Sequence, residues 1–157
     1  MIRLIGTLFY FGLFPFAPGT VGSILAIIIG IILFKLIGII YFCICIFFIF
    51  CIGWWVCNKI ILKAKNKDPS EIIIDELVGQ WIALLPVFWF AEKNFESTNI
   101  PIFELFLALI LFRIFDIIKI GPMKWADNLT SGLGVMLDDL FAGILSAIIL
   151  LLYLLVT

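Results

Sequence analysis

The feature that most constrains the fold is a series of long apolar stretches, which leave little of the chain for a water-facing surface. Between Thr20 and Cys57 only Lys35 carries a charge, and no charge occurs from Leu140 to Val156. A helix needs about 20 apolar residues to cross the hydrocarbon of a bilayer. These stretches therefore predict membrane-crossing helices rather than the elements of a water-soluble core.

The composition supports an integral membrane protein. Hydrophobic residues make up 65% of the 157 residues, and the mean hydropathy is +1.31. Soluble domains are about 45–50% apolar, and one small core could not bury this excess. The net charge is −1 and no basic block is present, so we expect no nucleic-acid partner. Nothing indicates a second domain, and residues 1–157 are expected to form a single membrane domain.

The apolar runs predict an all-α, polytopic bundle of about five transmembrane or membrane-embedded helices. The expected spans are 20–37, 39–58, 72–91, 101–115 and 136–156. Gly38 marks a tight turn between the first two. Polar segments separate the others, over 58–71, 92–99 and 116–134.

The distribution of Lys and Arg predicts the orientation. With the N-terminus in the cytoplasm, eight basic residues face inward, whereas Lys35 and Lys93 face outward. The eight are Arg3, Lys59, Lys63, Lys65, Lys67, Arg113, Lys119 and Lys124. Prolines interrupt the aromatic stretch after Arg3, so we expect no cleavable signal peptide. This topology brings most polar residues to the headgroup level of the cytoplasmic leaflet.

Four cysteines lie in one predicted helix, and the chain has no histidine. Cysteines within one helix cannot easily form disulfides, and zinc sites usually recruit His or paired Cys-x-x-Cys motifs. We therefore interpret Cys43, Cys45, Cys51 and Cys57 as small apolar packing residues.

A glycine-rich helix start, "FPFAPGTVGS" (14–23), is a candidate anion site. Thr20 or Ser23 can cap the helix, and Gly19 and Gly22 let backbone N–H groups approach a ligand. A helix N-terminus favours anions. The segment is either a phosphate cradle or an ordinary helix start.

Two pairs of adjacent carboxylates open two of the predicted helices. Asp75 and Glu76 lie in "IIDELVG" (73–79), and Asp138 and Asp139 lie in "GLGVMLDDLFAGI" (132–144). An ionised carboxylate in hydrocarbon costs several kcal/mol unless it is paired or binds a metal. Such oxygen ligands select Mg²⁺, Ca²⁺ or Mn²⁺ over zinc. The alternatives are a wet interface for the first pair and a favourable helix-dipole interaction for the second.

The candidate phosphate-binding cations lie in "FRIFDIIK" (112–119). Arg113 and Asp116 are three residues apart and can pair on one helix face. Arg113 could instead hold a phosphate through two hydrogen bonds. Lys119 adds positive charge that attracts anionic lipid, or serves only as a membrane anchor.

Together these groups indicate a metal-bound phosphate ester at the membrane surface. The absence of histidine excludes lipid phosphatases with a histidine nucleophile. No cysteine is followed by Arg six residues later, which excludes cysteine phosphatases of the Cys-x5-Arg type.

The four motifs "PFAPGTVGS", "IIDELVG", "FRIFDIIK" and "GLGVMLDDLFAGI" resemble phosphatidylglycerophosphatase A, in order and spacing, from about Gly6 to Tyr153. The resemblance implies Mg²⁺-dependent hydrolysis of phosphatidylglycerol phosphate in the bacterial inner membrane. The residues it singles out are Asp75, Glu76, Arg113, Asp116, Asp138 and Asp139.

The hypothesis assigns a role to each group. Glu76, Asp138 and Asp139 bind Mg²⁺, with Asp75 as a further ligand or as a base. Arg113 holds the phosphate and is oriented by Asp116, while Thr20 and the backbone of 19–23 donate hydrogen bonds. Two other classes stay open: a small cation carrier, which needs its carboxylates at the bilayer midplane, and a non-catalytic protein that binds anionic lipid.

Overall fold

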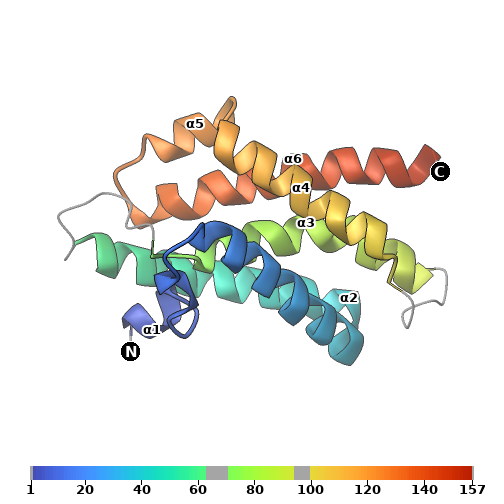
Figure 1. Ribbon diagram of the computed structural model, residues 1–157, viewed down its shortest axis with the longest axis horizontal. Coiled ribbons are helices and arrows are strands. Elements are labelled where there is room, and N and C mark those ends of the chain that lie inside the picture. The colour runs from blue at the N-terminus through green and yellow to red at the C-terminus, as the bar shows by residue number, and fades with distance from the viewer. Residues whose placement is uncertain (1, 63–70, 94–99, 157) are drawn as a thin grey trace.

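The computed structural model describes residues 2–62, 71–93 and 100–156, which form a helical bundle (Figure 1). No strand occurs in these three ranges, as the sequence predicts. The elements are α1 (Ile2–Gly6), η1 (Phe11–Leu13), α2 (Pro18–Ile61), α3 (Ile74–Lys93), α4 (Ile102–Ile118), α5 (Pro122–Asp127) and α6 (Gly132–Val156). Much of two predicted polar segments, 63–70 and 94–99, lies outside the described residues.

The α2 segment is a hairpin of two helical arms, and these arms are the first two predicted spans. Gly38 separates them with φ 73° and ψ 175°, in the region that favours glycine. The N–H of Ile39 donates to the Glu92 carboxylate at 3.2 Å, which ties the turn to the end of α3. Figure 1 shows the chain reversing direction at this turn.

Both arms of the hairpin pack along α3. At the turn end, Phe34 of the first arm stacks on Phe88 at 4.5 Å, and Phe42 of the second arm meets the same ring edge-on at 5.2 Å. In the first arm, the carbonyl of Ala26 accepts a hydrogen bond of 2.8 Å from the Trp81 indole. The hairpin therefore covers α3 over most of its length.

The α3 helix is the centre of the bundle. In the most apolar 18-residue stretch of α3, 72% is buried, whereas the corresponding stretches of α2 and α6 are 17% and 28% buried. It lies among α2, α4 and α6 (Figure 1). The polar backbone of α3 is thus shielded by protein, and its carboxylates at the first turn are held at one end of the bundle.

Within the described residues, three helices, α2, α3 and α6, are long and apolar enough to cross a membrane by length and composition. The α4 helix has 17 residues and corresponds to the predicted span 101–115. Large apolar side chains such as Ile32, Phe47 and Ile148 are exposed on the outer surface, as expected for lipid-facing helices. The short elements α1, η1 and α5 were not predicted, and α5 lies inside the predicted polar segment 116–134.

Candidate active site

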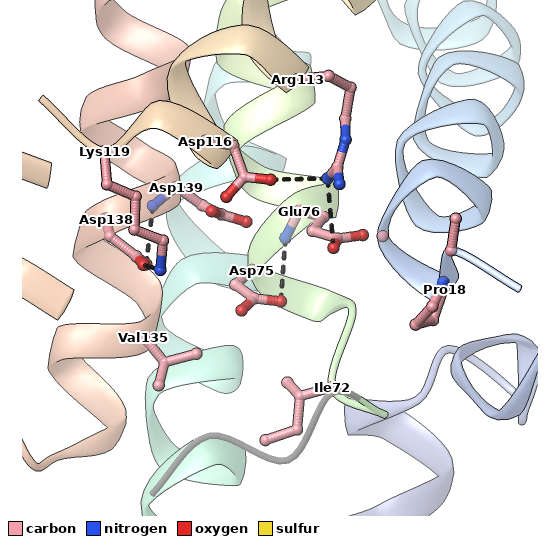
Figure 2. Close-up of a pocket in the computed structure, with 12 residues that line it drawn as sticks. Pro18, Ile72, Asp75, Glu76, Arg113, Asp116, Lys119, Val135, Asp138 and Asp139 are labelled. Atoms are coloured by element: carbon pink, nitrogen blue, oxygen red, sulfur yellow. Dashed lines mark hydrogen bonds and ion pairs between the residues drawn. The ribbon is translucent and has the colours of Figure 1, made fainter. Parts of the chain in front are cut away.

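One end of the bundle holds a polar pocket where four helices begin or end (Figure 2). The helices α2, α3 and α6 start there, and α4 ends there. The pocket has a volume of about 260 Å³. It is lined by Ala17, Pro18, Gly19, Ile72, Asp75, Glu76, Arg113, Asp116, Lys119, Val135, Asp138 and Asp139.

The two acid pairs meet because α3 and α6 touch backbone to backbone. A side chain at Gly143 would clash with the backbone oxygen of Gly79, and one at Gly79 would lie 2.6 Å from the carbonyl oxygen of Asp139. Both helices start at the pocket and run away from it (Figure 1). Gly79 follows Asp75 by four residues, as Gly143 follows Asp139. Each acid pair therefore lies about one turn from the contact, on the same side of it.

Arg113 joins carboxylates from two helices. Its guanidinium lies 2.7 Å from Asp116, three residues further along α4, and 3.5 Å from Glu76 of α3. A side chain at Gly19 would clash with Glu76 and would lie 2.8 Å from both terminal nitrogens of Arg113. The start of α2 thus lies directly against this ion pair, where only a glycine leaves room for it (Figure 2).

Lys119 pairs with two aspartates at the end of α4. Its ammonium lies 2.8 Å from Asp138 and also contacts Asp127 of α5. Burial alone would lower the pKa of Lys119, but the hydrogen bonds and charges of the two aspartates outweigh burial and raise that pKa. Lys119 therefore stays cationic throughout the neutral range.

The pocket carries more negative than positive groups. Five carboxyl side chains line it against two cationic ones, an excess of three negative charges when all are ionised. Asp139 is only 3% exposed, and its Oδ2 has no hydrogen-bond partner among the described residues. Buried charge without compensation is costly. The excess and the orphaned oxygen both fit a bound cation, which would also offset the repulsion between these carboxylates and a phosphate dianion.

The carboxylates are not preassembled around an ion. Within the described ranges, no three His, Cys, Asp or Glu side chains form a group ready to hold a metal. Glu76 and Asp138 are instead paired with Arg113 and Lys119. The donor chemistry and the shared pocket fit Mg²⁺, provided that some carboxylates turn from their cationic partners toward the ion.

Most of the predicted site residues line this pocket, but three do not. Asp75, Glu76, Arg113, Asp116, Lys119, Asp138, Asp139 and Gly19 line it. Thr20, Gly22 and Ser23 are absent from the lining, and the buried Ser23 hydroxyl donates to the Gly19 carbonyl at 3.0 Å. That hydroxyl is thus used inside α2.

One ion pair beside the pocket was not predicted from the sequence. Asp127 pairs with Lys119 eight residues away, through the unpredicted helix α5. A Lys–Asp separation of eight has no special meaning in a continuous helix. Only the break at Gly121 and Pro122 hinted at a change of direction there.

Comparison with known proteins identifies the family of the chain. The model of the family "Phosphatidylglycerophosphatase A" matches residues 4–154. Proteins of that name from Escherichia coli and Haemophilus influenzae are 32% and 33% identical to the chain. Those alignments cover 88% and 94% of the chain, and 75% and 85% of the relatives.

A third relative has a different name. A Bacteroides thetaiotaomicron protein called "Putative phosphatidylinositol-3-phosphatase" is 37% identical over 94% of the chain and 89% of its own length. No solved structure matches the chain. The family match spans nearly the whole sequence, and all three relatives are named as phosphatases of phospholipids. The chain therefore belongs to the phosphatidylglycerophosphatase A family and is a phosphatase.

Proposed function

We propose that this phosphatase hydrolyses phosphatidylglycerol phosphate to phosphatidylglycerol and inorganic phosphate, with Mg²⁺, at the cytoplasmic leaflet of a bacterial inner membrane. The observation that carries the proposal is the pocket itself. Five carboxylates and two cations meet at one end of an apolar bundle. That composition suits a divalent cation together with a phosphomonoester, at the depth where a lipid presents its headgroup.

The depth of the pocket argues against a cation carrier. Transport sites lie near the bilayer midplane, whereas this pocket lies where α2, α3 and α6 begin. The apolar remainder of these helices extends away from it on one side only (Figure 1). The arrangement supports chemistry at a membrane surface rather than passage through the membrane.

The residues of the pocket divide into two sets. Glu76, Asp138 and Asp139 are the proposed ligands, and Arg113 and Lys119 are the proposed phosphate contacts. A bound Mg²⁺ polarises phosphoryl oxygens and lowers the pKa of a coordinated water. Arg113 offers the phosphate two parallel N–H donors, and Asp116 at 2.7 Å keeps the guanidinium oriented toward the pocket.

The resting ion pairs link metal binding to substrate binding. Glu76 and Asp138 neutralise Arg113 and Lys119 in the structure. With a metal bound, Glu76 and Asp138 would serve as its ligands, and Arg113 and Lys119, still beside Asp116 and Asp127, would contact the phosphate. Asp75, on the wall of the same pocket, is the proposed base that takes a proton from the water whose oxygen bonds to phosphorus. The phosphorus–oxygen bond to glycerol breaks, and the released glycerol oxygen takes a proton from solvent to become the alcohol of phosphatidylglycerol.

The proposed orientation is supported by the basic residues of the described chain. Lys59, Arg113, Lys119 and Lys124 lie in or beside helix ends at the pocket end, and Arg3 lies in α1, which packs against α2. Lys35 lies near the Gly38 turn and Lys93 ends α3, both at the opposite end. Cytoplasmic flanks carry the excess of Lys and Arg. Figure 1 also shows the C-terminus at the end away from the pocket. A reporter enzyme that is active only outside the cytoplasm should therefore be active when fused to the C-terminus. An inactive fusion would indicate the opposite orientation.

The decisive experiment measures phosphate release by purified protein in mixed micelles. Phosphatidylglycerol phosphate and phosphatidylinositol 3-phosphate are compared at equal surface concentration, with Mg²⁺ and with chelator. We expect preference for the first substrate, loss of turnover with chelator, and loss of at least 100-fold in Asp139→Asn. Glu104→Gln, which removes a carboxylate at the opposite end of α4, should retain activity.

Each alternative has its own result in this assay. Turnover that persists with chelator present refutes the role of Mg²⁺. Preference for phosphatidylinositol 3-phosphate would indicate the activity for which the Bacteroides relative is named, instead of the proposed one. Binding of anionic lipid with no phosphate release from either substrate favours a non-catalytic lipid-binding protein.

A further inference from the structure

A second pocket, with a purely apolar lining, lies between the first arm of α2 and helix α4. It has a volume of about 260 Å³. Its walls include Ile24, Ile27 and Ile28 of α2, and Leu105, Phe106 and Leu109 of α4. Ile28 and Phe106 are 51% and 59% exposed, so the groove opens to the outer surface of the bundle. In a bilayer, that surface meets lipid.

The groove lies between two of the four helices that line the polar pocket. Gly19 of α2 and Arg113 of α4 line the polar pocket. At 1.5 Å per residue, Ile24 and Ile28 lie about 7 and 13 Å further along α2. On α4, which runs toward the pocket, Leu109 and Phe106 lie about 6 and 10 Å before Arg113. The groove therefore starts about one helical turn from the phosphate contacts and continues toward the bilayer interior.

A phospholipid substrate has the same arrangement of chemistry. Its phosphomonoester must reach Arg113, while its fatty acyl chains extend from the glycerol into hydrocarbon. We propose that the groove between α2 and α4 binds one acyl chain of the lipid substrate whose phosphate enters the polar pocket, an inference that rests on the proposed function. The two cavities lie along one pair of helices, about one turn apart, and this alignment of a polar and an apolar site favours a lipid substrate as the occupant.

The groove is expected to orient the bound lipid substrate rather than to increase its overall affinity. Lipid tails are as apolar as leucine, so moving a chain from bilayer to groove provides no hydrophobic driving force. A chain held between two helices nevertheless fixes the lateral position and tilt of the lipid, and thus the approach of its phosphate. Correct placement of reacting groups is worth large factors in rate. Filling the groove should therefore lower kcat/KM only for substrates with long chains.

The test fills the groove and compares substrates with and without long tails. Ile28→Trp places an indole in the groove, and Ile110→Trp is the matched control on α4, outside the lining and equally exposed at 52% against 51%. Dioleoyl and dibutanoyl phosphatidylglycerol phosphate are the two probes. We expect Ile28→Trp to lower kcat/KM at least tenfold for the dioleoyl lipid and less than twofold for the dibutanoyl lipid. Ile110→Trp should change neither by more than twofold.

A second measurement keeps the inference testable when Ile28→Trp folds poorly. Wild-type protein is irradiated with phosphatidylglycerol phosphate that carries a diazirine in one acyl chain, and the labelled peptides are mapped. Labels concentrated on 24–28 and 105–109 support the groove. Labels spread evenly over all exposed faces, or equal losses on both lipids in Ile28→Trp, overturn it. Wild type that releases no phosphate from either lipid refutes the proposed function instead, and the labelling then tests the groove alone.

Discussion

Gly143→Ala is the change that most directly tests how the active site is built. A methyl group at 143 would clash with the Gly79 backbone oxygen and lie 3.0 Å from its carbonyl carbon and its Cα. Because these are backbone atoms, no side chain can rotate away. To restore ordinary contact distances, α6 must move from α3 by roughly 1 Å. The displacement occurs one turn from Asp139, so the two acid pairs separate.

The expected loss is large in activity and moderate in stability. A misplacement of about 1 Å can cost on the order of 100-fold in rate, which corresponds to about 2.7 kcal/mol of transition-state stabilisation. Overpacking lowers the free energy of unfolding by about 1–3 kcal/mol. The assay is phosphate release from phosphatidylglycerol phosphate at several Mg²⁺ concentrations, with the melting temperature measured in the same detergent. We expect kcat/KM to fall about 100-fold at saturating Mg²⁺.

Ser146→Ala is the control on the same helix. Its hydroxyl donates only within α6, to the Ala142 carbonyl at 2.7 Å, and its loss should change kcat/KM by less than twofold. Gly79→Ala should resemble Gly143→Ala, and the double variant should lose less than the product of both losses, because one displacement relieves both clashes. If Gly143→Ala lowers the melting temperature yet keeps kcat/KM within threefold of wild type, the helix contact does not position the carboxylates.

Three further predictions concern the polar groups. Arg113→Lys should raise KM about tenfold, because one ammonium cannot bridge Glu76 and Asp116 while holding a phosphate as a guanidinium does; an unchanged KM would exclude the phosphate contact. Gln80→Met should raise the free energy of unfolding by about 1 kcal/mol, since neither polar atom of this buried amide has a hydrogen-bond partner in the described part of the chain; a lower melting temperature would contradict this. The pKa of Lys119 is raised above its ordinary value of about 10.4, so its charge persists at every lower pH. Activity should therefore show no Lys119-dependent fall below about pH 10, and a basic limb abolished by Lys119→Arg would contradict the raised pKa.

The helices could be predicted because apolar length alone marks a membrane span. The expected segments 72–91, 101–115 and 136–156 agree with α3, α4 and α6 to within a few residues. The turn at Gly38 is confirmed as well. The short helices α1 and α5 were missed, since a helix of one or two turns depends on tertiary contacts rather than on a long periodic pattern.

The meeting of the charged residues could also be predicted, but not their pairings. Successive spans return alternate loops to the same end, which is why the acid pairs and Arg113 were expected together. The sequence could not predict which face of each helix points into the bundle, because helices that are apolar nearly all round have no distinct buried face. Ser23 therefore was expected in the site, whereas its hydroxyl is bonded to Gly19 within α2.

The close contact of Gly79 and Gly143 also sets how the enzyme responds to bilayers of different thickness. Helices adapt to a thinner or thicker membrane by changing tilt, and two helices in contact tilt about the point where they touch. The acid pairs lie about 6 Å from that point, whereas the end of α6 at Val156 lies about 20 Å from it. A relative tilt of about 3° would then move the carboxylates by about 0.3 Å and the far end by about 1 Å. The geometry of catalysis is thus placed where mechanical adjustment of the membrane disturbs it least.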